Sequence, residues 1–234
     1  MEQTFKEKME KKCPEITQLQ QEQFEKYKDL LLEWNEKINL TAITDEDDII
    51  LKHFIDSMTI LKHIDNNSSI VDVGTGAGFP GVPVKIANPS LNVTLVDSLN
   101  KRLLFLGDVI NQLNLKQIKT VHSRAEEFGQ NKLYREKFDV ATSRAVANLS
   151  VLVEYLLPLV KIGGKCICMK GSEIEEELKN SKEAIKILGG QIETVEEFTL
   201  PESDIKRSII IIKKIKQTPK GYPRNPGTPS KKPL

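Results

Sequence analysis

Two stretches near the N-terminus carry apolar residues at helical spacing. From Phe24 to Ile38, large apolar side chains recur every three or four residues, which predicts one amphipathic helix with a buried face. A second helix is expected from Ile49 to Leu61, because Thr44-Asp45-Glu46-Asp47 resembles an N-cap with acids in the first turn. Residues 1–66 are therefore expected to form a helical extension.

From Ile70 onward, short β-rich runs alternate with helical patterns. Strands are expected at residues 70–73, 92–97, 118–122, 138–142, 165–169, 191–199 and 208–215. Helical patterns separate the first five runs, as in a doubly wound, mostly parallel sheet. Only a short segment containing Pro201 separates the last two, so these are expected to pair as an antiparallel hairpin.

A glycine-rich turn directly follows the first expected strand. Ile70-Val71-Asp72-Val73 leads into glycines at positions 74, 76, 78 and 81. Glycine can adopt positive φ and lets a ligand approach the backbone, and a helix starting after the turn would direct free N–H groups at an anion. Asp97 ends the next expected strand, about 20 residues on, where an acid can bind two ribose hydroxyls. These features predict a site for a ribose-bearing cofactor.

Two cofactors fit this turn, and a turn with glycines for packing alone is a third interpretation. Gly76-x-Gly78-x-x-Gly81 matches the frame of dinucleotide-binding reductases. Gly74-x-Gly76-x-Gly78, preceded by Asp72, matches the frame of S-adenosylmethionine enzymes. Asp72 favours the second, because an anion would repel a pyrophosphate but attract the ammonium of a methionine moiety, directly or through water. We therefore predict an α/β class I S-adenosylmethionine-dependent methyltransferase fold, with its seven-stranded sheet in residues 67–216.

Composition limits the class of protein and the cellular compartment that can be expected. The chain is 39% hydrophobic and 29% charged, which is ordinary for a globular domain. Three cysteines without a signal peptide fit the reducing cytoplasm, and Cys166 and Cys168 are expected to be small core residues. No Cys/His cluster has metal-ligand spacing and no apolar run approaches membrane-spanning length, so neither a metal nor a membrane is expected.

The chain is basic from Lys206 onward, with no acid and recurrent prolines. Residues 217–234 are predicted to be a basic, proline-rich tail that cannot pack on a core and is extended or disordered when free. Contact with nucleic-acid phosphates is favoured over a solubilising role, because the charge is all of one sign. Deletion of the tail is expected to weaken RNA binding more than cofactor binding.

Specific motifs recur in order along almost the whole chain. They are Trp34-Asn35, Asn39-Leu40-Thr41-Ala42-Ile43, His53-Phe54-Ile55-Asp56-Ser57, the run from Asp72 to Gly81, Asp97-Ser98, Arg124-Ala125-Glu126-Glu127, Phe138-Asp139, Thr142-Ser143-Arg144-Ala145-Val146-Ala147, Lys170-Gly171, Tyr222-Pro223-Arg224 and Gly227-Thr228-Pro229. In these motifs the sequence resembles the ribosomal RNA small-subunit methyltransferase G family, also called glucose-inhibited division protein B.

The resemblance implies methyl transfer from S-adenosylmethionine, leaving S-adenosylhomocysteine, to N7 of a guanine in the 530 loop of 16S ribosomal RNA. It implies that Gly74 and Phe79 line the methionine side of the cofactor, that Ala125 and Glu126 meet the adenine, and that Arg144 completes the pocket. Arg144, expected just after the fourth strand, could instead bind an RNA phosphate. The expected partner is 16S ribosomal RNA or the small ribosomal subunit, and we expect a cytoplasmic monomer.

The implied chemistry needs no general base, because guanine N7 has a free lone pair at neutral pH. We therefore assign no catalytic residue, and alignment of the reactants should supply most of the catalysis. Lys52, Lys170, Arg207 and Arg224 are predicted RNA contacts by charge, and His53 is predicted to lie near the substrate. The remaining alternatives are a methyltransferase acting on another substrate and a noncatalytic RNA-binding module.

Overall fold

A seven-stranded sheet runs through the protein in the order β3-β2-β1-β4-β5-β7-β6. The computed structural model describes residues 3–144 and 146–234. The strands are β1 (Ser69–Val73), β2 (Asn92–Asp97), β3 (Ile118–His122), β4 (Phe138–Arg144), β5 (Val160–Lys170), β6 (Gly190–Thr199) and β7 (Lys206–Lys214). β1 to β5 pair in parallel, and β7 is antiparallel to both of its neighbours. The predicted mostly parallel sheet with a terminal hairpin is confirmed.

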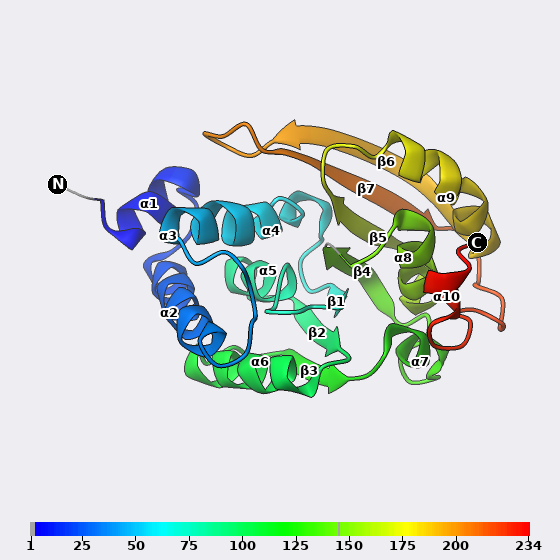
Figure 1. The fold of residues 1–234 in the computed structure, drawn as a ribbon, viewed down its shortest axis with the longest axis horizontal. Coiled ribbons are helices and arrows are strands. Elements are labelled where there is room, and N and C mark those ends of the chain that lie inside the picture. The colour runs from blue at the N-terminus through cyan, green and yellow to red at the C-terminus, as the bar shows by residue number, and fades with distance from the viewer. Residues whose placement is uncertain (1–2, 145) are drawn as a thin grey trace.

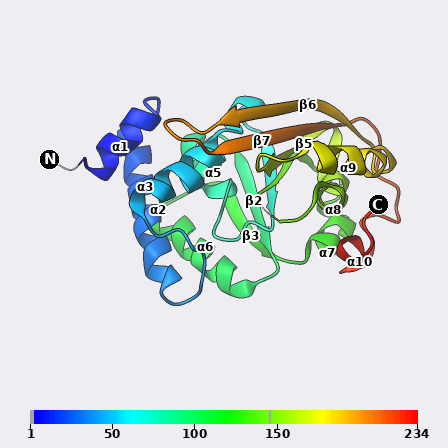
Figure 2. The same ribbon diagram turned by 45° about the horizontal axis from the view of Figure 1, so that its top comes forward.

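Helices cover both faces of this sheet (Figure 1). They are α1 (Phe5–Lys12), α2 (Gln18–Asn35), α3 (Glu46–Asp48), α4 (Asp56–Met58), α5 (Gly81–Ala87), α6 (Asn100–Gln112), α7 (Ala125–Gln130), α8 (Leu149–Leu156), α9 (Glu175–Ile187) and α10 (Thr228–Lys231). A π-helical segment, Ile49–Ile55, joins α3 to α4, and short 3₁₀ turns occupy Leu61–His63 and Leu157–Leu159. Figure 2 shows α1 and α2 at one end of the molecule and α7 and α10 at the other.

The sheet is buried on both sides, which gives the protein two apolar cores. In β7, Ile209 and Ile211 join the core shared with α2, α5 and α6, while Ile210 and Ile212 join the core shared with α8 and α9. Side chains alternate across a strand, so a strand covered on both faces reads as a continuous apolar run. Cys166 and Cys168 lie in the second core with free thiols, as predicted.

The N-terminal helices pack on the sheet through the predicted apolar face. Phe24, Tyr27 and Leu31 of α2 are fully buried in the same core as Ile70 of β1. The side chain of Asp45 accepts a hydrogen bond from the Asp48 amide and so caps α3. This packing places the π-helical segment against the carboxyl end of the sheet, where the site described below is built.

Residues 217–234 also pack on the protein, and the prediction that they cannot is wrong. Thr218, Pro223 and Pro229 are buried against the side of the molecule that carries α7 and α8 (Figure 1). Arg224 forms a forked pair with Glu154 of α8, with Nη2–Oε2 at 2.6 Å and Nε–Oε1 at 2.9 Å. Arg135 donates to the carbonyl of Thr218 at 2.9 Å. Specific partners in the folded domain, which composition does not reveal, hold this segment in place.

Candidate functional site

A cavity of about 680 Å³ opens at the carboxyl ends of β1, β2 and β4. Its wall includes Val73, Asp97 and Arg144, each at the end of one of these strands. From β1 the chain passes to β2 and β3 on one side, and later returns to place β4 on the other. Such a switch in strand order leaves a crevice in which α/β proteins bind ligands. The cavity therefore lies where the sheet topology predicts a ligand.

The glycine-rich loop after β1 forms the floor of the cavity. Gly74, Gly76 and Gly78 have φ angles of 69°, 60° and 99°, which residues other than glycine rarely adopt. A Cβ at Gly76 would approach nothing closer than the Gly74 carbonyl oxygen at 4.0 Å, whereas one at Gly78 would lie 2.6 Å from the Tyr27 hydroxyl. Gly76 thus leaves room for a ligand, while Gly78 permits close packing beneath the loop.

Asp72 lies beneath this loop and is fully buried. Its Oδ2 accepts hydrogen bonds from the Gly81 amide at 3.0 Å and the Thr75 hydroxyl at 2.6 Å. Among the described residues Oδ1 has no hydrogen-bond partner, and burial raises the pKa of the carboxyl to about 6. A buried oxygen without a donor fits a cationic ligand nearby. Because Asp72 does not itself line the cavity, contact through a water is the better fit.

Asp97, at the end of β2, fastens the loop from the other side. Its Oδ2 accepts from the Gly76 amide at 2.9 Å and from Arg102 Nη1 at 3.3 Å, and its Oδ1 accepts from the Leu99 amide at 2.9 Å. A carboxylate offers about four acceptor positions. A ribose diol would therefore need Arg102, whose side chain is 37% exposed, to turn away.

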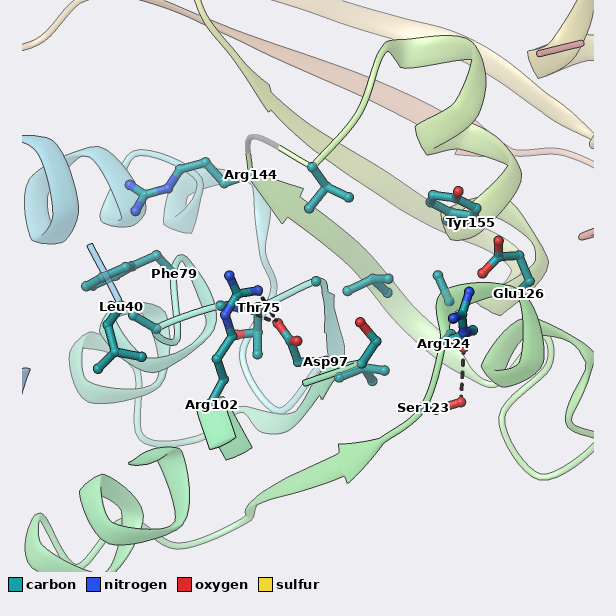
Figure 3. Close-up of a pocket in the computed structure, with 18 of the residues that line it drawn as sticks. Leu40, Thr75, Phe79, Asp97, Arg102, Ser123, Arg124, Glu126, Arg144 and Tyr155 are labelled. Atoms are coloured by element: carbon teal, nitrogen blue, oxygen red, sulfur yellow. Dashed lines mark hydrogen bonds and ion pairs between the residues drawn. The ribbon is translucent and has the colours of Figure 1, made fainter. Parts of the chain in front are cut away.

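One end of the cavity carries an aromatic stack that includes Phe79, which Figure 3 shows below Arg144. The His53 ring lies on the Phe79 ring, with centroids 4.3 Å apart and planes 14° apart, and the Arg144 guanidinium lies 4.9 Å from the Phe79 centroid. Arg144 Nη2 is 3.2 Å from His53 Nδ1. Since a guanidinium only donates, Nδ1 accepts, and Nε2 then donates to the Thr41 hydroxyl at 2.9 Å. Burial and then Arg144 lower the pKa of His53 to about 4, so the imidazole is neutral at pH 7.

The buried carboxylate of Asp56 joins two arginines at this end. Its Oδ2 accepts from Arg144 Nη1 at 3.0 Å, and its Oδ1 accepts from Arg207 Nε at 3.1 Å. Arg144 Nη1 also donates to the Lys52 carbonyl at 3.0 Å. Arg144 is the last residue of β4 rather than the residue after it. Its guanidinium is thus already bound to a carboxylate of this chain, which leaves less of it for a phosphate.

The opposite end of the cavity is walled by α7, α8 and the C-terminal segment, and Figure 3 shows Glu126 and Tyr155 there. Glu126 Oε1 accepts from the Gly227 amide at 2.8 Å, and the Tyr155 and Ser230 hydroxyls are 3.0 Å apart. Ala125 lies beside them in the wall. Sequence reasoning missed Tyr155, Gly227 and Ser230. The Gly227-Thr228-Pro229 motif was the available signal, but a motif alone does not show which surface it meets.

Four of the five residues predicted to contact RNA form ion pairs within the chain. The pairs are Lys52 with Asp48, Lys170 with Glu177, Arg207 with Asp56 and Arg224 with Glu154. Of the five, only His53 lines the cavity. Contact with RNA at these positions stays a prediction.

The remaining expectations concern metals, membranes and the segment after β4. Within residues 3–144 and 146–234, no group of three or more His, Cys, Asp or Glu side chains could hold a metal ion. In the same residues no helix has the length and apolar character needed to cross a membrane. Ala145, in the motif that ends β4, lies outside the described residues.

Sequence comparisons identify close relatives over most of the chain. The model of a family described as rRNA small subunit methyltransferase G matches residues 20–209. The ribosomal RNA small subunit methyltransferase G of Acetivibrio thermocellus is 60% identical over 220 residues, which cover 92% of this chain and 90% of that protein. The protein of the same name from Alkaliphilus metalliredigens is 55% identical over 210 residues, covering 89% of this chain and 88% of that protein.

Solved structures share the fold at much lower identity. M. jannaschii TYW2 in complex with AdoMet superposes with a TM-score of 0.53 and 13% identity, covering 68% of this chain and 74% of that chain. The [4+2]-cyclase SpnF superposes with a TM-score of 0.55 and 14% identity, covering 68% of this chain and 80% of that chain. These likenesses show the fold alone, because one fold can carry different reactions.

Proposed function

This chain belongs to the rRNA small subunit methyltransferase G family, and on that premise we propose that its cavity binds S-adenosylmethionine and serves methylation of N7 of a guanine in the 530 loop of 16S ribosomal RNA. Family membership makes the chain an rRNA methyltransferase. The base and the atom are the finer proposal. The observation that carries the cofactor assignment is the buried Asp72 Oδ1, which has no hydrogen-bond partner within residues 3–144 and 146–234 and lies beneath a glycine loop that borders the cavity.

The lining of the cavity fits the parts of this cofactor in order. Glu126 and Ala125 at one end would hold the adenine, and Asp97 in the middle would hold the ribose. Gly74 and Gly76 would lie along the methionine moiety, whose ammonium Asp72 would attract through water. Phe79 and Arg144 would close the far end. All of these residues come from one chain, so a monomer suffices for binding.

The proposed reaction needs little from the protein beyond alignment of the reactants and a cavity that does not repel the positive charge formed on guanine. S-adenosylmethionine supplies an electrophilic methyl group on sulfur. The N7 lone pair would form the new N–C bond as the C–S bond breaks, leaving S-adenosylhomocysteine and a cationic guanine. His53 is neutral and Arg144 is balanced by Asp56, so this end of the cavity adds little repulsion against the new cation.

The proposal also covers the substrate and its location. Ribosomal RNA is found where ribosomes are assembled, so we place the reaction in the cytoplasm, on 16S ribosomal RNA or on the small subunit. In either substrate the guanine must be unstacked or already exposed for N7 to enter the cavity. The nucleic-acid face would include the rim near His53.

Methyl transfer from labelled S-adenosylmethionine to unmodified small subunits and to naked 16S RNA tests the proposal. Nuclease digestion and mass analysis should identify 7-methylguanosine, and the better substrate shows whether assembly matters. A different methylated nucleoside would refute the N7 assignment. Absence of label with cofactor binding intact would favour a noncatalytic RNA-binding module or another substrate. The variant Asp97→Asn should reduce both cofactor affinity and label, because it removes the charge that the ribose assignment requires.

A further inference from the structure

The C-terminal segment contacts the wall of the site at Glu126 and at Tyr155. Glu126, at the start of α7, is 6% exposed and lines the cavity. Its Oε1 is held by the Gly227 amide at 2.8 Å. Among the described residues no protein donor binds Oε2, which leaves that oxygen available to a donor in the cavity. The Gly227 amide therefore fixes which way the carboxylate faces.

We propose that residues 224–230 form the adenine wall of the cofactor site and position Glu126 to select an amino group over a carbonyl at C6 of the purine. The inference rests on the proposed S-adenosyl ligand, and it assigns the segment a role in cofactor selectivity. Gly227 acts as a positioning residue through its backbone N–H, and Ser230 lines the same end of the cavity.

Residues 224–230 make enough contacts with the folded domain to hold the Glu126 side chain in one orientation. Glu154, which is fully buried, accepts from the Arg224 amide at 2.8 Å as well as from its guanidinium. Gln130 of α7 donates to the Pro223 carbonyl at 2.6 Å. Beyond Gly227, the Ser230 hydroxyl meets the Tyr155 hydroxyl at 3.0 Å. Contacts on both sides of Gly227 therefore fix its amide relative to α7 and α8.

The chemistry of the two purines makes this arrangement selective. Adenine presents an N–H donor at C6, which a carboxylate oxygen can accept. Hypoxanthine presents a carbonyl oxygen at C6, which a carboxylate would repel and leave without a donor. Both carboxylate oxygens only accept, and the Gly227 amide, by binding Oε1, holds Oε2 toward the position of the C6 group.

Two variants separate positioning from general stability. In Glu126→Gln the Gly227 amide must still be met by an oxygen, so the Nε2 amino group is forced to face the cavity as a donor. Removal of residues 226–234 keeps Arg224 and its pair with Glu154 but deletes the Gly227 amide. Lys232→Ala is the matched control, because it removes charge from an exposed position of the same segment.

Calorimetric titration with S-adenosylhomocysteine and with its 6-oxo analogue, S-inosylhomocysteine, tests the proposal. The unaltered protein and Lys232→Ala should prefer the adenosyl ligand by tenfold or more. Glu126→Gln should reverse this preference. Removal of residues 226–234 should weaken adenosyl binding about tenfold and inosyl binding little, and in combination with Glu126→Gln it should abolish the reversal, because the amide can then rotate.

The outcomes distinguish this inference from the proposed function. Binding of neither ligand by the unaltered protein would overturn the cofactor assignment and this inference with it. Normal adenosyl binding, together with unchanged selectivity after removal of residues 226–234, would overturn the inference alone. Equal loss of both ligands would also overturn it, because the segment would then act only through stability. If the shortened protein fails to fold, Glu126→Gln decides, and an unreversed preference counts against the proposal.

Discussion

At the scale of single residues, His53 contacts three neighbours at once. It stacks on Phe79, accepts from Arg144 and donates to Thr41. The Arg144 contact requires an unprotonated Nδ1, and burial adds to the cost of a positive charge. A protonated His53 would therefore have to break away from Arg144.

Because protonation of His53 breaks its contact with Arg144, we expect the stability of the protein to depend on pH. The folded pKa of His53 is about 4, below the 6.5 of an unperturbed histidine, so the unfolded chain binds more protons between these values. This histidine therefore lowers the free energy of unfolding as pH falls from 6.5 to 4, by about 3 kcal/mol. Urea unfolding of the protein and of His53→Gln across this range should show that the difference between them changes by this amount.

The effect of His53 must be measured against a His53 variant, because Asp72 also titrates in this pH range. Its folded pKa of about 6 lies above the usual value of 3.8, so its contribution to stability is present at low pH and is lost as pH rises through 6. The two groups oppose each other, and the total pH dependence alone does not isolate His53. Parallel pH curves for the protein and His53→Gln would contradict the assignment.

At the scale of elements, the loop between β1 and α5 shows two uses of glycine. Gly76 has open space on its side-chain side, whereas Gly78 is enclosed by Tyr27, Val82 and Leu106. The positive φ at Gly78 adds strain for any other residue. The loop therefore depends on Gly78 for packing with the N-terminal helices.

Alanine at Gly78, compared with alanine at the unobstructed Gly107 of α6, tests the close packing of the loop. Gly78→Ala should lower the free energy of unfolding by about 2–4 kcal/mol, because its Cβ would lie within 2.8 Å of three side chains at an unfavourable φ. Gly107→Ala in α6 should raise it by up to about 1 kcal/mol, since its Cβ meets nothing and alanine favours a helix. Denaturant midpoints of both variants measure the two effects. Similar destabilisation by both would argue against close packing at Gly78.

At the scale of the whole molecule, Asp56 ties three distant parts of the chain together. It follows the π-helical segment and binds Arg144 at the end of β4 and Arg207 on β7. With 2% of its surface exposed, it is shielded from water. These pairs anchor the N-terminal helices to both the parallel part of the sheet and the terminal hairpin.

Neutralising Asp56 should therefore destabilise the whole protein. Asp56→Asn leaves two largely buried guanidinium groups without an anion, and we expect a loss of about 3 kcal/mol in the free energy of unfolding. Glu33→Gln, which removes the partner of exposed Lys37, is the control and should leave the unfolding midpoint almost unchanged. Chemical denaturation followed by circular dichroism measures both. A small effect at Asp56 would mean that the three parts are held by apolar packing alone.

Much of this architecture could be predicted from sequence, because local patterns determine it. Alternating β-rich and helical runs indicated seven strands, and the short connection containing Pro201 indicated the hairpin. The glycine loop and Asp97 indicated the position of the cavity. Contacts between distant residues carry no local pattern, so the His53–Phe79 stack and the pairing of Arg224 with Glu154 could not be predicted. Positive charge alone suggested RNA contacts for four side chains that form ion pairs within the chain, namely Lys52, Lys170, Arg207 and Arg224.

The wall of the cavity draws on residues from Leu40 to Ser230. During synthesis, the glycine loop leaves the ribosome well before Gly227, whose amide binds Glu126. A nascent chain consequently lacks one wall of this cavity until residue 230 has emerged and packed against α8.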